Sequence, residues 1–126
     1  DHPHTLASRA NLAGVLADRG RWEEAEAEER AVYQAFSRVL GEDHPETLTS
    51  RANLANVLGQ RGRWEEAEAE QRATLEVRRR VLGEDHPETL TSRANLAGVL
   101  ADRGRWEEAE AEHRAVYQAF SRVLGE

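Results

Sequence analysis

The chain has no cysteine, methionine, isoleucine or lysine, and only 6% of its 126 residues are aromatic. Without cysteine there is no disulfide framework, thiolate nucleophile or thiolate metal ligand, which fits a reducing compartment. No apolar run approaches the roughly 18 residues that a membrane-spanning helix needs, and no signal peptide opens the sequence. We therefore expect a cytoplasmic protein with no membrane partner.

Positive charge is also scarce. Acidic residues outnumber basic ones by 24 to 17, which gives a net charge of −7, and every basic residue is arginine. Each third of the sequence is acidic. Proteins that bind nucleic acid need a basic surface to neutralise phosphates. We therefore expect no nucleic-acid partner.

The sequence repeats with a period of 42 residues. Asp-His-Pro occurs at the start of each of three segments, 1–42, 43–84 and 85–126, and the first and third segments differ at only three positions. In a tandem array each repeat contacts only its neighbours, so stability is a sum of repeat and interface contributions. We expect one continuous array that is part of a longer protein.

Each repeat is predicted to form two helices, described here for the first helix of the middle repeat. Asp43 is expected to cap this helix, with Pro45 in its first turn and Glu46 reaching back to the cap. The helix should continue to Arg61. Gly62 then supplies the residue most easily placed in the left-handed conformation that closes a helix.

The second helix is expected to start near Trp64 and to end before Gly83, with glutamates in its first turn and arginines in its last turns. At about 100° per residue its apolar side chains share one arc, with Gln71 in the middle. The first helix has a wider apolar arc, typical of a helix packed on two neighbours. We therefore predict an all-α, right-handed α-solenoid of three tandem 42-residue helix-turn-helix repeats, with six helices.

Three segments resemble the tetratricopeptide repeat family, in the 42-residue variety of kinesin light chain and bacterial signalling proteins. They are Asn-Leu-Ala at 53–55, Gly-Arg-Trp-Glu-Glu-Ala-Glu at 62–68 and Leu-Gly-Glu-Asp-His-Pro-Glu-Thr-Leu at 82–90. The resemblance covers the whole chain. Compared with the common 34-residue repeat, Arg51 replaces a tryptophan, Ala55 a glycine and Gln71 a typical aromatic residue. The resemblance implies a protein-interaction scaffold whose first helices line a concave, peptide-binding groove.

One polar arc on the first helix of each repeat is the candidate groove surface. Its side chains fall within roughly 60° of one another by helical geometry, and most of its positions vary between repeats. Asparagine recurs at one position, and an amide can both donate to and accept from a peptide main chain. The alternative is an ordinary solvated face. The predicted groove residues are Asn11, Asp18, Thr49, Asn53, Asn56, Gln60, Thr91, Asn95 and Asp102.

A second hypothesis is self-association, by end-to-end stacking or by exchange of a helical segment. The second helix of the third repeat carries Val116, Tyr117 and Phe120, which match residues that an internal interface should bury. The first helix of the chain offers Leu6, Leu12, Val15 and Leu16 as the complementary surface. Head-to-tail contacts of this kind repeat without closing and give filaments.

The sequence does not predict an enzyme, a metal site or a cofactor. His44 and His86 are one repeat apart, too far to share an ion with bonds of about 2 Å, and are better explained as parts of helix caps. His113 is expected to lie partly buried at a helix interface. No metalloprotease motif, phosphate-binding loop or nucleophile-base spacing is present. The three tryptophans are expected to pack rather than to bind a ligand.

Overall fold

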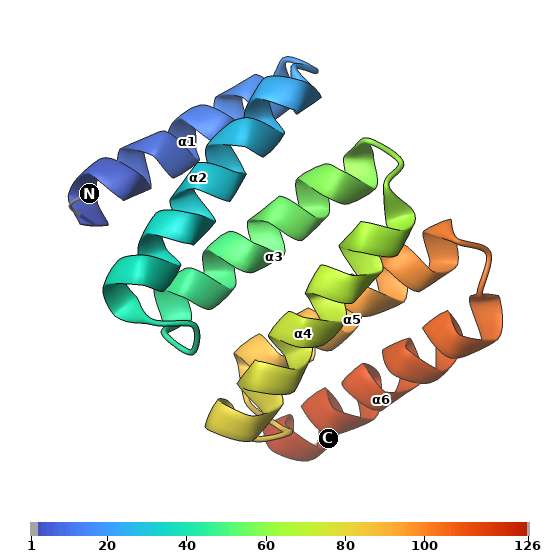
Figure 1. The fold of residues 1–126 in the computed structure, drawn as a ribbon. Helices are drawn as coiled ribbons and strands as arrows, with labels where there is room; N and C mark the ends of the chain where they lie inside the picture. The colour runs from blue at the N-terminus through green and yellow to red at the C-terminus, as the bar shows by residue number, and fades with distance from the viewer. Residues whose placement is uncertain (1–2, 126) are drawn as a thin grey trace. The chain divides into compact units, whose positions relative to one another are not determined.

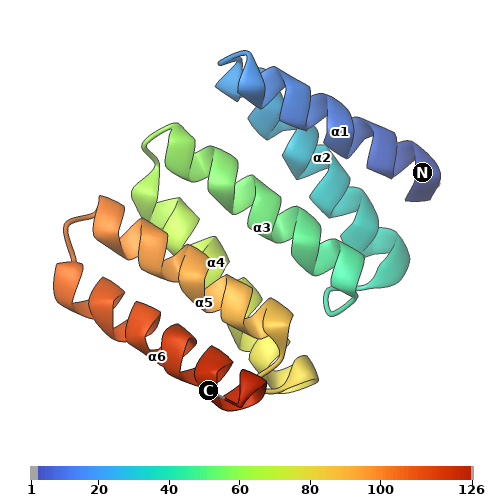
Figure 2. The same cartoon turned by 180° about the vertical axis from the view of Figure 1, so that it is seen from behind.

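The computed structural model describes residues 3–125, which form six α-helices and, within that range, no strand. Figures 1 and 2 show α1 packed beside α2, and α5 packed beside α6, as antiparallel pairs. The all-α prediction and the repeated helix pairs are confirmed. The helices are α1 (Pro3–Asp18), α2 (Trp22–Leu40), α3 (Pro45–Gln60), α4 (Trp64–Leu82), α5 (Pro87–Asp102) and α6 (Trp106–Leu124).

The chain forms two compact units, Asp1–Ala67 and Glu68–Glu126, which meet inside α4. The first unit contains α1, α2, α3 and the first residues of α4, and the second contains the rest of α4 with α5 and α6. The three repeats predicted from the sequence, 1–42, 43–84 and 85–126, stay a prediction.

The start of α3 corrects the predicted cap. His44, not Asp43, is the capping residue, because its backbone is extended and its Nδ1 accepts a hydrogen bond of 3.1 Å from the backbone N–H of Glu46. A residue that precedes proline is pushed out of the helical region, so Pro45 fixes residue 44 as the last non-helical one. Glu46 is then only the second helical residue, one position short of a capping box. His86 caps α5 in the same way, whereas Asp1 and His2 lie outside the described residues.

The glycine at the end of α3 has the predicted left-handed conformation. Gly62 has φ of 78°, its N–H bonds to the carbonyl of Gly59, and the N–H of Arg63 bonds to the carbonyl of Leu58. These two bonds satisfy carbonyls that have no partner in the helix. The turn therefore places Arg61 and Arg63 on either side of one glycine, immediately before α4.

In the first unit, α2 lies between α1 and α3. Leu6 of α1 is fully buried in a cluster with Val32, Ala35 and Phe36 of α2. Further along, Leu16 of α1, Ala25 of α2 and Val57 of α3 form a second cluster. On α3 the buried residues run along the whole helix, and Val57 packs on α2. That the first helix of a repeat packs on two neighbours stays a prediction.

In the second unit, Leu75 of α4 packs with Leu96 and Leu100 of α5 and with Ala109 of α6. The α4 surface is more polar than that of α2, since Arg78 occupies the position of Phe36. The Arg78 guanidinium donates to Ser92 Oγ at 2.8 Å, and Thr89 Oγ1 donates to the Arg78 carbonyl at 3.3 Å. Burial lowers the pKa of Arg78, against the opposing effect of Glu88. The interface between α4 and α5 thus buries a charged side chain where α2 buries Phe36.

Candidate interaction surfaces

The polar arc lies on the surface of the first helices. In the first unit Asn11 of α1 is exposed and Asn53 of α3 is half-buried, and in the second unit Asn95 of α5 is half-buried. Within the described part of the chain these three amide side chains make no hydrogen bond, so their donors and acceptors face solvent. The remaining predicted groove residues, Asp18, Thr49, Asn56, Gln60, Thr91 and Asp102, are all exposed.

One threonine of the arc already uses its hydroxyl for a hydrogen bond within its own helix. Thr91 Oγ1 donates to the carbonyl of Pro87 at 3.0 Å, which is a bond between residues one helical turn apart. Asn56 also has a partner within the chain. Thr91 and Asn56 thus have partners within the chain, whereas the amides of Asn11, Asn53 and Asn95 make no hydrogen bond in the described residues.

Three apolar or aromatic side chains of α6, Val116, Tyr117 and Phe120, form the surface that we call the tail seam. Tyr117 is 72% exposed and Phe120 is 39% exposed, whereas Phe36, the equivalent of Phe120 in α2, is 3% exposed. Val116 is half-buried, and its equivalent Val32 is fully buried. The same residue types are thus covered where a third helix packs on α2 and open on α6. His113 is exposed for the same reason, contrary to the expectation of partial burial.

On α1 the structure divides the residues predicted for self-association into two groups. Leu6 and Leu16 are buried within the first unit, where Leu6 packs on α2 and Leu16 packs on α2 and α3, and Leu16 also lines a surface hollow beside Leu12. Leu12 and Val15 are 48% and 54% exposed, and their equivalents in α3, Leu54 and Val57, are 3% and 6% exposed. We call Leu12 and Val15 the head seam.

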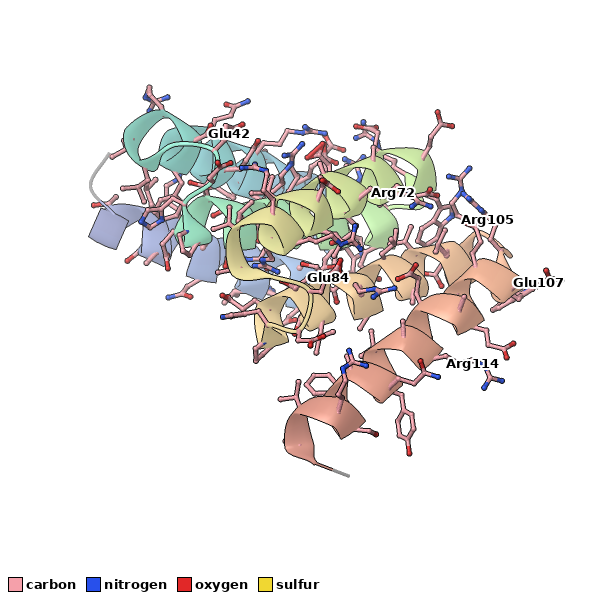
Figure 3. The ribbon with its side chains drawn as sticks, turned by 90° about the horizontal axis from the view of Figure 1, so that it is seen from below. Glu42, Arg72, Glu84, Arg105, Glu107 and Arg114 are labelled. Carbon is pink, nitrogen blue, oxygen red and sulfur yellow. The ribbon has the colours of Figure 1, made fainter. Side chains whose placement is uncertain are left out.

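Sequence reasoning missed an ion cluster in each unit, which we call a clasp. In the first unit the buried carboxylate of Glu26 on α2 forms an ion pair of 3.0 Å with Arg30 of the same helix. It also forms ion pairs of 2.7 Å with Arg61 and 3.0 Å with Arg63, which lie in the turn before α4. In the second unit Glu68 receives Arg72 at 2.8 Å, Arg103 at 2.7 Å and Arg105 at 2.9 Å. Figure 3 labels Arg72 and Arg105, the two of these arginines that come from α4 and from the turn before α6, and Arg114, which lies further along α6.

The clasps are electrostatically favourable in spite of their burial. Burial alone would raise the pKa of Glu26, but hydrogen bonds from Arg30 and Arg61 and the charge of Arg63 outweigh it and lower the pKa below its usual value. Glu68 is shifted in the same direction, where its arginines outweigh the effect of burial. Each clasp therefore holds an ionised glutamate between two consecutive helix pairs.

One buried carboxyl has no such compensation. Glu29 of α2 is 5% exposed, its Oε1 has no hydrogen-bond partner within the described residues, and burial raises its pKa to about 7. Gln71 takes the equivalent position in α4 and is also fully buried. Among residues 3–125 no group of three potential ligands could hold a metal ion.

Paired antiparallel helices in which one helix packs on two others define a helical repeat protein. The model of the tetratricopeptide repeat matches residues 4–72 and 51–122, and the chain belongs to this family. None of the curated proteins matches the chain. No helix in the described range is long and apolar enough to cross a membrane.

Solved structures agree with this assignment. The nearly identical TPR-like repeats of a Podosopora anserina protein assigned as a kinesin light chain match with a TM-score of 0.89 and 25% identity, over 98% of this chain. A variant of the same protein gives 0.88 at the same identity. This chain spans 58% of the length of those structures. BtubC (BKLC) from P. vanneervenii matches with a TM-score of 0.81 at 20% identity, over 90% of this chain and 45% of its own, which shows a shared fold.

Proposed function

We propose that this chain is a protein-interaction scaffold that binds a peptide or partner segment along the polar arc of its first helices. Tetratricopeptide repeats generally mediate protein–protein interaction. The observation that carries the proposal is the recurrence of Asn11, Asn53 and Asn95 at one position, each with an amide that makes no bond within the described chain. An amide on each first helix can donate a hydrogen bond to a ligand's main chain and accept one from it, whatever the ligand's side chains are.

Variation around the asparagines supports recognition of a particular sequence. The positions beside them carry Gly14 and Asp18 in α1, Asn56 and Gln60 in α3, and Gly98 and Asp102 in α5. Every one of these residues is exposed. A ligand would therefore meet a constant amide on each helix next to side chains that differ in size and charge.

The test starts from a random peptide library displayed on phage, which requires no prior choice of ligand. Selected peptides are labelled, and their Kd is measured by fluorescence anisotropy with the wild-type chain and with a variant carrying Asn11→Ala, Asn53→Ala and Asn95→Ala. Loss of each main-chain hydrogen bond should cost about 1 kcal/mol, or about fivefold in Kd. The control is Gln34→Ala with Gln118→Ala, which removes two exposed amides from second helices. Undiminished binding to the triple variant would exclude the polar arc.

The second candidate function is self-association through the head and tail seams. The observation that favours it is the burial of equivalent residues: Leu54 and Val57 are covered in the first unit, while the identical side chains Leu12 and Val15 are exposed. Tyr117 and Phe120 are exposed on α6. The two seams carry the same residue types as the two sides of the α2–α3 interface, so they are complementary in shape and polarity.

Sedimentation velocity over a concentration series tests this second function. The net charge of −7 opposes association at low ionic strength, so complexes should become more stable as salt screens the repulsion. A variant with Tyr117→Ser and Phe120→Ser should stay monomeric. A wild-type chain that remains monomeric at high concentration and moderate salt would show that the seams do not bind each other.

A further inference from the structure

We propose that the head of one chain binds the tail of a second copy through a completed clasp, in which Glu110 of one copy receives Arg19 and Arg21 of the other. Arg114 of the first copy would pair with Glu24 of the second. The proposal rests on self-association, the second proposed function, and adds to it the charged groups that fix the register and the order of the two surfaces.

The template for this contact is present in the first unit. Glu26 on α2 binds Arg61 and Arg63, which flank the glycine of the turn before α4, at 2.7 and 3.0 Å. Arg30, one turn further along α2, reaches Glu66 of α4 at 3.4 Å. A glutamate and an arginine on one second helix thus meet two arginines and a glutamate from the next helix pair.

The second unit repeats the arrangement with different residues. Glu68 binds Arg103 and Arg105 at 2.7 and 2.9 Å, and Arg72 approaches Glu108 at 3.6 Å. The two clasps occur in interfaces whose apolar residues differ, since Arg78 replaces Phe36. The ion cluster is therefore a property of the stacking geometry and not of one set of apolar neighbours.

The same residues stand half-assembled at the two ends of the described chain. The side chain of Glu110 is 62% exposed and pairs with Arg114 of its own helix, whereas that of Glu26 is only 9% exposed. Arg19 is exposed, and Arg21 pairs with Glu24. That pair need not break, because Arg63 pairs with Glu66 and Arg105 with Glu108 while each also binds its clasp glutamate.

The head surface also has a hollow where the partner helix would lie. It measures about 360 Å³ and is lined by residues of α1 and α2 that include Leu12, Leu16, Arg21 and Glu24. The equivalents of the last two are Arg63 and Glu66, which in the first unit bind Glu26 and Arg30 of α2. The hollow therefore corresponds to the space that a second helix fills inside the chain.

The occupant is a second copy because both apolar and charged residues match. The exposed residues along the head are identical in type to residues that α3 buries: Thr5, Ser8, Leu12 and Val15 correspond to Thr47, Ser50, Leu54 and Val57. On the tail, Val116, Tyr117 and Phe120 correspond to Val32, Tyr33 and Phe36. Opposite charges then face each other at each clasp position, which favours this register over a slipped one.

The experiment uses two variants of the 126-residue chain, each of which can form the head-to-tail contact at only one of its two surfaces. The head-blocked chain carries Leu12→Lys and Val15→Lys, and the tail-blocked chain carries Tyr117→Lys and Phe120→Lys; all four residues are exposed, so the fold is retained. Their 1:1 complex is measured by sedimentation velocity and its Kd by fluorescence titration. Glu110→Arg is then added to the head-blocked chain, and Arg19→Glu with Arg21→Glu to the tail-blocked chain.

Reversing the charges on one partner alone should raise Kd at least about tenfold, and reversing them on both should restore most of the affinity. The effect should shrink as salt is added, because screening weakens the ion pairs. If the two blocked chains do not bind each other, the proposal of self-association is wrong, and the proposed clasp between copies is then wrong as well. If they bind but Kd does not change when the charges are reversed, or if reversal on both partners fails to restore binding, the proposed clasp is wrong. The apolar seams alone would then account for the contact. Dimerisation of either blocked chain by itself would also overturn the head-to-tail arrangement.

Discussion

Replacing Glu29 with glutamine should stabilise the chain, and the gain should depend on pH. Glu29 is almost completely buried on α2, and its pKa is raised by burial from the usual 4.5 to about 7. Glutamine resembles the protonated acid in size and carries no charge. The chain already places a glutamine, Gln71, at the equivalent buried position of α4.

The sign follows from proton linkage. Below about pH 4.5 the carboxyl is protonated in both the folded and the unfolded chain, so it contributes no pH dependence. Between 4.5 and about 7 the unfolded chain releases the proton while the folded chain retains it, so stability falls as pH rises. Above that range both states are ionised and the loss is complete. The shift corresponds to about 3 kcal/mol at most.

Urea denaturation at a series of pH values, followed by helical circular dichroism, measures this effect. The difference in unfolding free energy between Glu29→Gln and wild type should be small near pH 5 and should approach its maximum near about pH 8. The same difference for Glu23→Gln, an exposed position on α2, should stay close to zero. Taking differences cancels the opposite pH dependence of Glu26 and Glu68. A constant difference across the range, or one that is larger at acid pH, would refute the reasoning.

Three further substitutions test the caps, clasps and packing by the same denaturation assay. Glu68→Ala leaves three arginines without their shared carboxylate and should lower the unfolding free energy by about 2 kcal/mol. The exposed control Glu110→Ala should lower it by about 0.5 kcal/mol or less. Equal losses would show that the clasp does not stabilise the fold. His86→Ala should cost about 1 kcal/mol by removing the cap of α5, and His86→Asn should recover most of it. A neutral His86→Ala would show that the imidazole bond contributes nothing. Gly59→Ala should raise the unfolding free energy by about 0.5–1 kcal/mol, because alanine has the higher helix propensity. The added Cβ fits, since it would meet Trp64 at an ordinary contact distance of 3.4 Å. A destabilised Gly59→Ala variant would mean that Trp64 cannot accommodate the methyl group.

Local signals in the sequence were sufficient for the helices. The proline near each first helix and the glycine after Arg61 placed α3 correctly, since both act through the backbone of their immediate neighbours. The cap was misplaced by one residue because both Asp43 and His44 can accept a hydrogen bond. Only the constraint that Pro45 imposes on the residue before it decides between them.

Contacts between helix pairs were harder to predict. A single arc on α1 does not separate the flank that packs on α2 from the flank that faces away, so Leu6 and Leu16 were grouped with Leu12 and Val15. Glu68 and Arg72 have the spacing of an ordinary ion pair on one helix, and that spacing gives no sign of the two arginines that arrive from another turn. The available signal was the strict recurrence of Arg-Gly-Arg and of the clasp glutamate at the same period.

The clasp also bears on how such an array changes length through duplication in its gene. Each 42-residue segment carries one clasp glutamate and one Arg-Gly-Arg turn, and both belong to different interfaces. Inserting or deleting a whole segment, in any frame, leaves each internal clasp glutamate facing an arginine turn, whereas inserting a partial segment places a glutamate or a turn beside a neighbour that lacks its counterpart. Unequal recombination therefore yields folded products mainly in steps of the full period, and each such step adds one more interface of the same kind.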